Sequence, residues 1–112
     1  MEKEQIIIKK AKELFSEVGY KSTTMELLAD RCNMGKGTLY LYFKSKEDVL
    51  KSIIEQLIGT IEEKVRNIEK LNISFSEQIS MLLTEMIKIK KEQSLVVKLA
   101  FEAKQIGNKV VN

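Results

Sequence analysis

The sequence places a lysine between two glycines at residues 35 to 37, an arrangement that can hold phosphate. Glycines beside a lysine present backbone N–H groups and a cation, as they do in the loop that binds a nucleotide triphosphate. That loop also requires an earlier glycine, at the position of Asp30, and a Ser or Thr directly after Lys36, where this chain has Gly37. The spacing therefore excludes a nucleotide loop. It leaves open which other phosphates this stretch could hold.

Catalytic and metal-binding sites find little support in the composition. The chain has no histidine and one cysteine, Cys32, so neither the usual Cys/His metal site nor an internal disulfide can form. Without paired carboxylates in a pocket, we expect no enzyme, no cofactor and no metal. The apolar run at residues 6 to 8 is too short for a signal peptide or a membrane span. We therefore expect a cytoplasmic protein without a membrane partner.

Charge gives only a local indication of a partner. The formal net charge is +3, from 19 Lys plus Arg against 16 Asp plus Glu, with both signs mixed along the chain. Residues 35 to 46 differ, because they carry Lys36, Lys44 and Lys46 and no acidic residue. Composition alone favours a solvated face here, because ordinary protein surfaces carry similar runs.

The elements that must position this stretch are helices. The chain of 112 residues is 44% hydrophobic and lacks proline, which is typical of a helical globular protein. Helical periodicity predicts six helices. The first covers residues 3 to 18 and the last residues 92 to 106. The four between them begin at Thr23 or Thr24, at Lys36, at Ser45 (for about six turns) and at Ser74. Gly19 is placed to end the first helix and Gly107-Asn108 to end the last. We expect an all-α fold.

Two small residues inside these helices indicate how the helices pack. Gly59 interrupts the long helix that follows Ser45, at a cost of about 1 kcal/mol relative to Ala. We favour close packing against another helix there over a bend. Cys32 lies on the apolar face of the second helix, and we expect it in the core.

The second and third helices, joined by a short break that contains glycine, have the form of a helix-turn-helix. In the third helix, Leu39 and Phe43 lie one turn apart and face inward. Gly37, Thr38 and Leu41 must then face outward, while Tyr40 and Tyr42 flank the buried strip. The N-terminus of such a helix carries free N–H groups and a partial positive charge, which suit DNA phosphates. Gly35 and Gly37 have no side chains to hold the backbone away. The stretch therefore indicates a DNA backbone as the ligand.

About fifty residues carry a specific pattern across these helices. Its parts are Ala11, Leu14-Phe15, Gly19-Tyr20, Thr23-Thr24-Met25, Leu28-Ala29 and the run GKGTLYLYFKSKEDVL from Gly35 to Leu50. In spacing, residue type and helix phase they closely resemble the DNA-binding domain of the tetracycline-repressor (TetR) family. The resemblance implies a helix-turn-helix domain over residues 1–47. It also implies that residues 48–112 form part of a helical ligand-binding and dimerisation domain, truncated within an apolar pattern.

The function that the resemblance implies is a ligand-responsive transcriptional regulator, usually a repressor. It would bind a palindromic operator in double-stranded DNA as a homodimer in its full-length form. By position in the family pattern, contacts to bases or backbone would come from Lys36, Gly37, Thr38, Tyr40 and Tyr42, and phosphates would be held by Thr24 and Lys46. Leu41 could either meet a thymine methyl or pack on a sugar-phosphate edge.

An unknown small-molecule effector would bind among the later helices. Met86, Leu95 and Phe101 could line part of that pocket, although such a stripe is also typical of an ordinary core. The alternative to a DNA-binding regulator is a helical protein-interaction module, since amphipathic helices alone would serve it. That alternative predicts no sequence-specific DNA binding.

Overall fold

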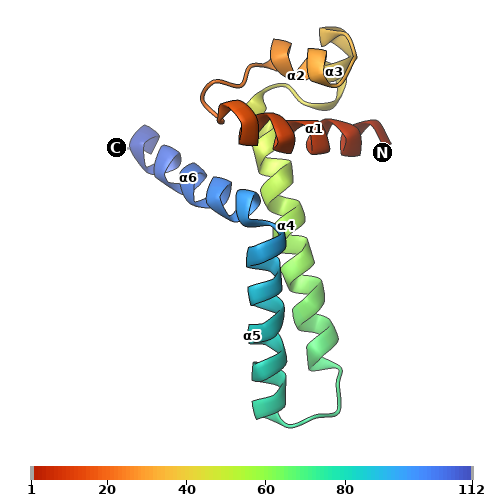
Figure 1. Cartoon of the computed structure of the whole chain (residues 1–112), viewed down its shortest axis with the longest axis vertical. Helices are drawn as coiled ribbons and strands as arrows, with labels where there is room; N and C mark the ends of the chain where they lie inside the picture. Colours follow the sequence, from red (N-terminus) through yellow and green to blue (C-terminus); the bar gives the residue numbers. More distant parts are fainter. Residues whose placement is uncertain (1, 112) are drawn as a thin grey trace. The chain divides into compact units, whose positions relative to one another are not determined.

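The computed structural model describes residues 2–111, with the side chains of all of these except residues 103 and 105–111. Its helices, labelled in Figure 1, are α1 (Glu2–Val18), α2 (Met25–Arg31), α3 (Lys36–Tyr42), α4 (Lys46–Glu69), α5 (Phe75–Glu92) and α6 (Ser94–Val111). The described residues contain no strand. The predicted all-α class is therefore confirmed.

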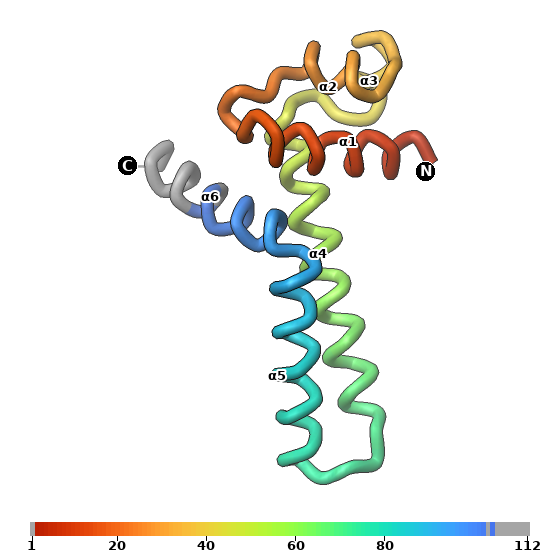
Figure 2. The backbone as a smooth tube through the Cα atoms, in the orientation of Figure 1, coloured from red at the N-terminus to blue at the C-terminus, as the bar shows by residue number. Residues whose placement is uncertain are grey.

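The chain packs as two units, Met1–Ile53 and Ile54–Asn112. The division runs through α4, so the first unit holds α1 to α3 with the start of α4. The second unit holds the rest of α4 with α5 and α6, which the tube in Figure 2 follows from green to blue. Each unit buries apolar side chains of its own helices.

The core of the first unit comes from the predicted apolar faces of its helices. Its most deeply buried members are Ile7, Ala11, Leu14 and Phe15 of α1, Leu28 and Ala29 of α2, Leu39 of α3 and Val49 and Ile53 of α4. These positions recur at helical spacing within each element, so every helix presents one apolar side to the others. The core thereby fixes which side of α3 remains available to a ligand.

The turn between α1 and α2 is held by side chains. Gly19, at a φ of 86°, ends α1 as predicted, and its amide donates to the Phe15 carbonyl at 3.0 Å. The hydroxyl of Thr23, only 1% exposed, donates to the Gly19 carbonyl at 2.8 Å. The hydroxyl of Thr24 accepts from the Leu27 amide at 3.1 Å. Thr24 is thus the N-cap of α2, which decides between the two threonines.

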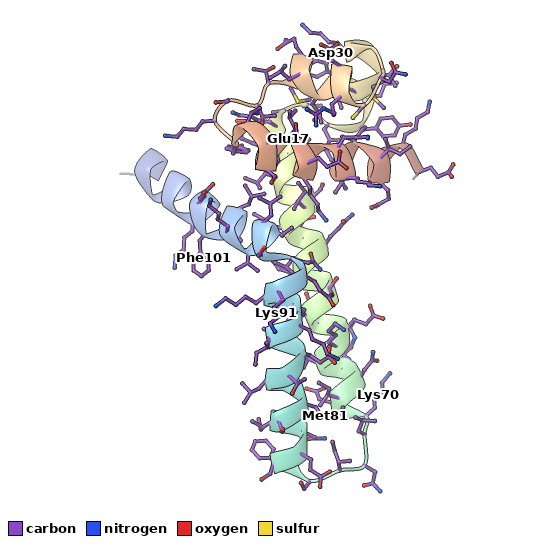
Figure 3. All side chains as sticks on the ribbon, in the orientation of Figure 1. Glu17, Asp30, Lys70, Met81, Lys91 and Phe101 are labelled. Carbon is purple, nitrogen blue, oxygen red and sulfur yellow. The ribbon has the colours of Figure 1, made fainter. Side chains whose placement is uncertain are left out.

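An ion pair also joins α1 to α2. The Arg31 guanidinium donates through Nη1 to Glu17 Oε1 at 3.0 Å and through Nη2 to Glu17 Oε2 at 2.6 Å. Figure 3 labels Glu17 on α1. The two hydrogen bonds from Arg31 hold the pKa of the Glu17 carboxyl below its ordinary value. This two-pronged geometry adds a directed contact between α1 and α2 at the surface.

In the second unit, α5 returns alongside α4 (Figure 1). Lys64 Nζ of α4 lies 2.9 Å from Glu85 Oε2 of α5, and Gln78 Nε2 donates to the Ile68 carbonyl at 3.4 Å. The Ser74 hydroxyl caps α5 by accepting from the Glu77 amide at 3.2 Å. No helix among the described residues is long and apolar enough to cross a membrane.

Three expectations about small residues were wrong. The helix α6 continues through Gly107 and Asn108 to Val111, because one glycine costs a helix only about 1 kcal/mol. Gly59 is exposed, and a Cβ added there would meet nothing within 4 Å, so no other described helix packs closely at this point. Cys32 is half-buried rather than in the core, and its partial burial raises the pKa of the thiol.

Candidate nucleic-acid interface

The break between α2 and α3 has the compact form that a helix-turn-helix needs. Asn33 takes a left-handed conformation with a φ of 57°, which asparagine tolerates better than most residues. The following amide, of Met34, donates to the Ala29 carbonyl at 3.0 Å and folds the chain back on α2. Gly35 is the N-cap of α3 and makes no side-chain hydrogen bond to it. Within the described chain, the first amides of α3 thus have no capping side chain.

The phase of α3 agrees with the sequence prediction. Leu39 is fully buried and Phe43 is 7% exposed, so these two residues fix the helix to the core. On the opposite side, Leu41 is 82% exposed and Tyr40 42% exposed. An outward leucine beside a tyrosine is an unusual surface for a helix that contacts only water. Gly37 is also exposed and Tyr42 is half-buried at the flank, as predicted. Thr38 and Tyr40 differ from the prediction, because Thr38 is half-buried and Tyr40 is the exposed one.

Neither glycine around Lys36 is required by the fold of the chain itself. A Cβ added at Gly35 or Gly37 would meet no described atom within 4 Å. Neither residue takes a positive φ, so alanine would fit the backbone at both positions. Because Gly35 and Gly37 have no side chains, a ligand has room to approach the start of α3 closely.

Lys36 carries an ion pair that the sequence did not indicate. Its Nζ lies 2.8 Å from Oε1 of Glu26 on α2, and both side chains are more than half exposed. The hydrogen bond from Lys36 is the largest cause that lowers the pKa of the Glu26 carboxyl, and the same bond raises the pKa of Lys36. Glu26 lies three residues after Thr23, a spacing typical of a capping box, and nothing in that spacing indicates a contact with Lys36.

Lys46, at the start of α4, has its ammonium group against the α1–α2 turn. Its Nζ donates to the carbonyls of Tyr20 at 2.8 Å and Lys21 at 3.2 Å, and lies 4.5 Å from the centre of the Tyr20 ring. Tyr20 in turn packs edge-on against Phe15, with ring centres 5.1 Å apart. Burial, followed by the charge of Glu47, raises the pKa of Tyr20 to about 12. Sequence reasoning missed these contacts because the residues come from separate elements.

The predicted DNA-binding residues all lie in the first unit. Thr24 caps α2, Lys46 begins α4, and α3 supplies Lys36, Gly37, Thr38, Tyr40, Leu41 and Tyr42. Thr24 and Lys36 both act on the carboxyl of Glu26. The structure therefore brings the starts of α2 and α3 together at Glu26, which is not among the predicted DNA-binding residues.

The second unit contains an open apolar groove of about 570 Å³. It is lined by Leu57, Ile61, Met86, Ile89, Lys90, Val97, Ala100, Phe101 and Lys104. Met86 and Phe101, two of the three predicted effector-binding residues, are among them, and Figure 3 labels Phe101 on α6. Leu95 does not line this groove. The two lysines are the charged groups of the lining.

Comparison with known proteins places this arrangement among bacterial regulators. The sequence pattern described as "Bacterial regulatory proteins, tetR family" matches residues 7–53. The HTH-type transcriptional regulator YhgD of Bacillus subtilis is 31% identical over 111 residues, covering 99% of this chain and 58% of the relative.

Two solved structures have the same fold. A TerR/AcrR-family transcriptional regulator of Aquifex aeolicus superposes with a TM-score of 0.74 at 32% identity, over 87% of this chain and 53% of that one. A putative fatty acid metabolism regulator of Clostridium perfringens superposes with a TM-score of 0.76 at 26% identity, over 94% and 61%. This chain thus spans little more than half the length of these proteins.

Proposed function

Because the chain belongs to the TetR family of bacterial regulatory proteins, and is thus a DNA-binding transcriptional regulator, we propose that it acts as a ligand-responsive repressor. It binds a palindromic operator as a homodimer in the cytoplasm. The observation that carries this proposal is the outward surface of α3, where Leu41 is 82% exposed and Tyr40 42% exposed beside a fully buried Leu39. A helix that packs on the core with one side and exposes the other side to solvent suits insertion into a major groove.

The residues of α3 take different parts in this proposal. Leu41 meets a thymine methyl or a sugar edge, because it offers only apolar surface. Thr38, Tyr40 and Tyr42 supply hydroxyls to bases or backbone. The open space around Gly37 supports a close approach of the DNA backbone, because no part of the protein occupies it.

Thr24, Lys36 and Lys46 bind phosphates in the same proposal. An ammonium group has three N–H donors, and Lys46 donates two of them to the carbonyls of Tyr20 and Lys21. The third donor is left for a phosphate, while the other two keep the group in place. Lys36 differs, because its partner is the carboxyl of Glu26, which a phosphate would have to displace.

A homodimer follows from the limited reach of one helix-turn-helix. A single short recognition helix buries too little surface for tight operator binding, so two copies at fixed spacing are needed. We propose that residues 1–47 form the DNA-binding domain and residues 48–112 part of the ligand-binding and dimerisation domain. The groove beside Met86 and Phe101 forms part of the effector site.

A mobility-shift assay with the DNA upstream of the protein's own gene tests DNA recognition. We expect a shift for the wild type and a loss of affinity for Tyr40→Ala, with helix content confirmed by circular dichroism. Ile58→Ala is the matched control, because Ile58 is similarly exposed at 47% but lies in the second unit. A protein-interaction module would give no sequence-specific shift and no loss with Tyr40→Ala.

The effector response is tested by adding long-chain fatty acids to the shifted complex. They are suitable first probes because the groove combines apolar residues with two lysines, and because the Clostridium perfringens neighbour is a putative fatty acid metabolism regulator. Release of the DNA that is abolished by Phe101→Glu would support the site. Release that persists in this variant would place the effector elsewhere.

A further inference from the structure

The ion pair between Lys36 and Glu26 lies where the proposed function requires a free cation. Lys36 is the first residue of α3, and its Nζ is 2.8 Å from the carboxyl of Glu26 in the first turn of α2. Both side chains are more than half exposed, so DNA could reach either of them. Glu26 is also the acidic residue whose charge and hydrogen bond act on Lys36 in the described chain.

A carboxylate at this place opposes DNA binding in two ways. It occupies the ammonium group that would contact a phosphate, and it offsets part of the positive charge that attracts the DNA backbone. Of the three lysines in residues 35 to 46, Lys36 is therefore the one whose charge is partly offset by a carboxylate in the described chain. When DNA binds, Lys36 must exchange one oxygen anion for another, and Glu26 remains beside a negatively charged backbone.

We propose that Glu26 is an affinity-limiting residue of the DNA-binding surface, which competes with a DNA phosphate for Lys36. This inference rests on the proposed function, because it needs DNA at α3. Glu26 lowers affinity for the backbone of any sequence, whereas contacts from α3 to base edges are unaffected. The competition therefore reduces non-specific binding more than recognition of the operator.

The competing explanation is that Glu26 serves only the fold. An acidic residue in the first turn of a helix stabilises its N-terminus. On that account, Glu26→Gln would lower the thermal midpoint slightly and leave DNA affinity unchanged or weaker. On our account, the same substitution strengthens DNA binding, because glutamine keeps the size of the side chain but releases the ammonium of Lys36.

The test measures binding of the full chain to a labelled duplex of mixed sequence by fluorescence anisotropy, over about 50 to 200 mM salt. We expect Glu26→Gln to bind about two- to fivefold more tightly, the range typical of exposed ion pairs. The dependence of log affinity on log salt should become steeper by about one unit, because one net positive charge is added. Circular dichroism verifies that each variant is folded.

Two further variants separate pairing from general charge. Glu62→Gln removes the same charge from an equally exposed ion pair, with Arg66 of α4 in the second unit, and should leave affinity nearly unchanged. In a Lys36→Met background, Glu26→Gln should lose most of its effect on DNA affinity, because no ammonium group is left for which Glu26 and a phosphate could compete.

The results separate the two ideas. Failure of the wild type and every folded variant to bind DNA would overturn the proposed function. Binding by the wild type with no gain from Glu26→Gln would overturn only the role of Glu26. An equal gain with and without Lys36 would likewise overturn it, since Glu26 would then act by simple repulsion.

Discussion

Replacing Gly37 with alanine should make the protein more stable and its DNA binding weaker. Gly37 is the second residue of α3, it is exposed, and a Cβ there would meet no described atom within 4 Å. Alanine in a helix is favoured over glycine by about 0.5–1 kcal/mol, because the unfolded chain loses fewer conformations. Since no clash offsets this gain, the free energy of unfolding should rise by that amount.

Both effects can be measured on the same preparation. Urea unfolding followed by circular dichroism gives the stability, and the thermal midpoint should rise by about 2–8 °C. Anisotropy with upstream DNA gives the affinity, which we expect to fall about tenfold, or about 1.4 kcal/mol, because the added methyl separates the backbone from the phosphate.

Gly59→Ala is the matched control for this experiment. Gly59 also lies within a helix, is exposed and has open space around its added Cβ, but it belongs to the second unit. It should gain the same stability with no change in DNA affinity. If Gly37→Ala bound DNA as well as the wild type, the reasoning about close approach at α3 would be refuted.

Three further predictions concern the α1–α2 turn. Lys46→Met removes the ammonium from its two carbonyl partners, so urea unfolding should show a loss of about 1 kcal/mol and anisotropy a weaker complex. Thr23→Val leaves the Gly19 carbonyl without its buried donor, which should cost about 1–2 kcal/mol, also measured in urea. Burial, with Glu47, raises the pKa of Tyr20 from 10.0 to about 12, so the folded state holds this proton more tightly. The resulting stability is present below about pH 10 and lost toward pH 12, and ultraviolet titration should show a late phase that Tyr20→Phe removes.

The sequence was sufficient for features that depend on periodicity. The inward phase of Leu39 and Phe43 and the exposure of Leu41 follow from helical spacing, and the structure has them as predicted. The left-handed Gly19 was predictable too, because few other residues tolerate that conformation.

Features that join separate elements could not be predicted in this way. The contacts of Lys36 with Glu26 and of Lys46 with Tyr20 depend on how the helices pack, which no local spacing encodes. The end of α6 was missed for a different reason, because one glycine changes helix stability by too little to decide where a helix stops. The roles of individual residues at DNA stay predictions.

The three consecutive carbonyls of residues 19 to 21 are all occupied by side chains, the first by Thr23 and the next two by Lys46. Thr23 directly precedes the residue that caps α2, and Lys46 is the first residue of α4. A displacement of the start of α4 must therefore carry the N-terminus of α2 with it, or break two hydrogen bonds. The turn thus links the start of α4 to the N-cap of α2 through side chains alone, so a rotation of one helix would be passed to the other without any change inside α3.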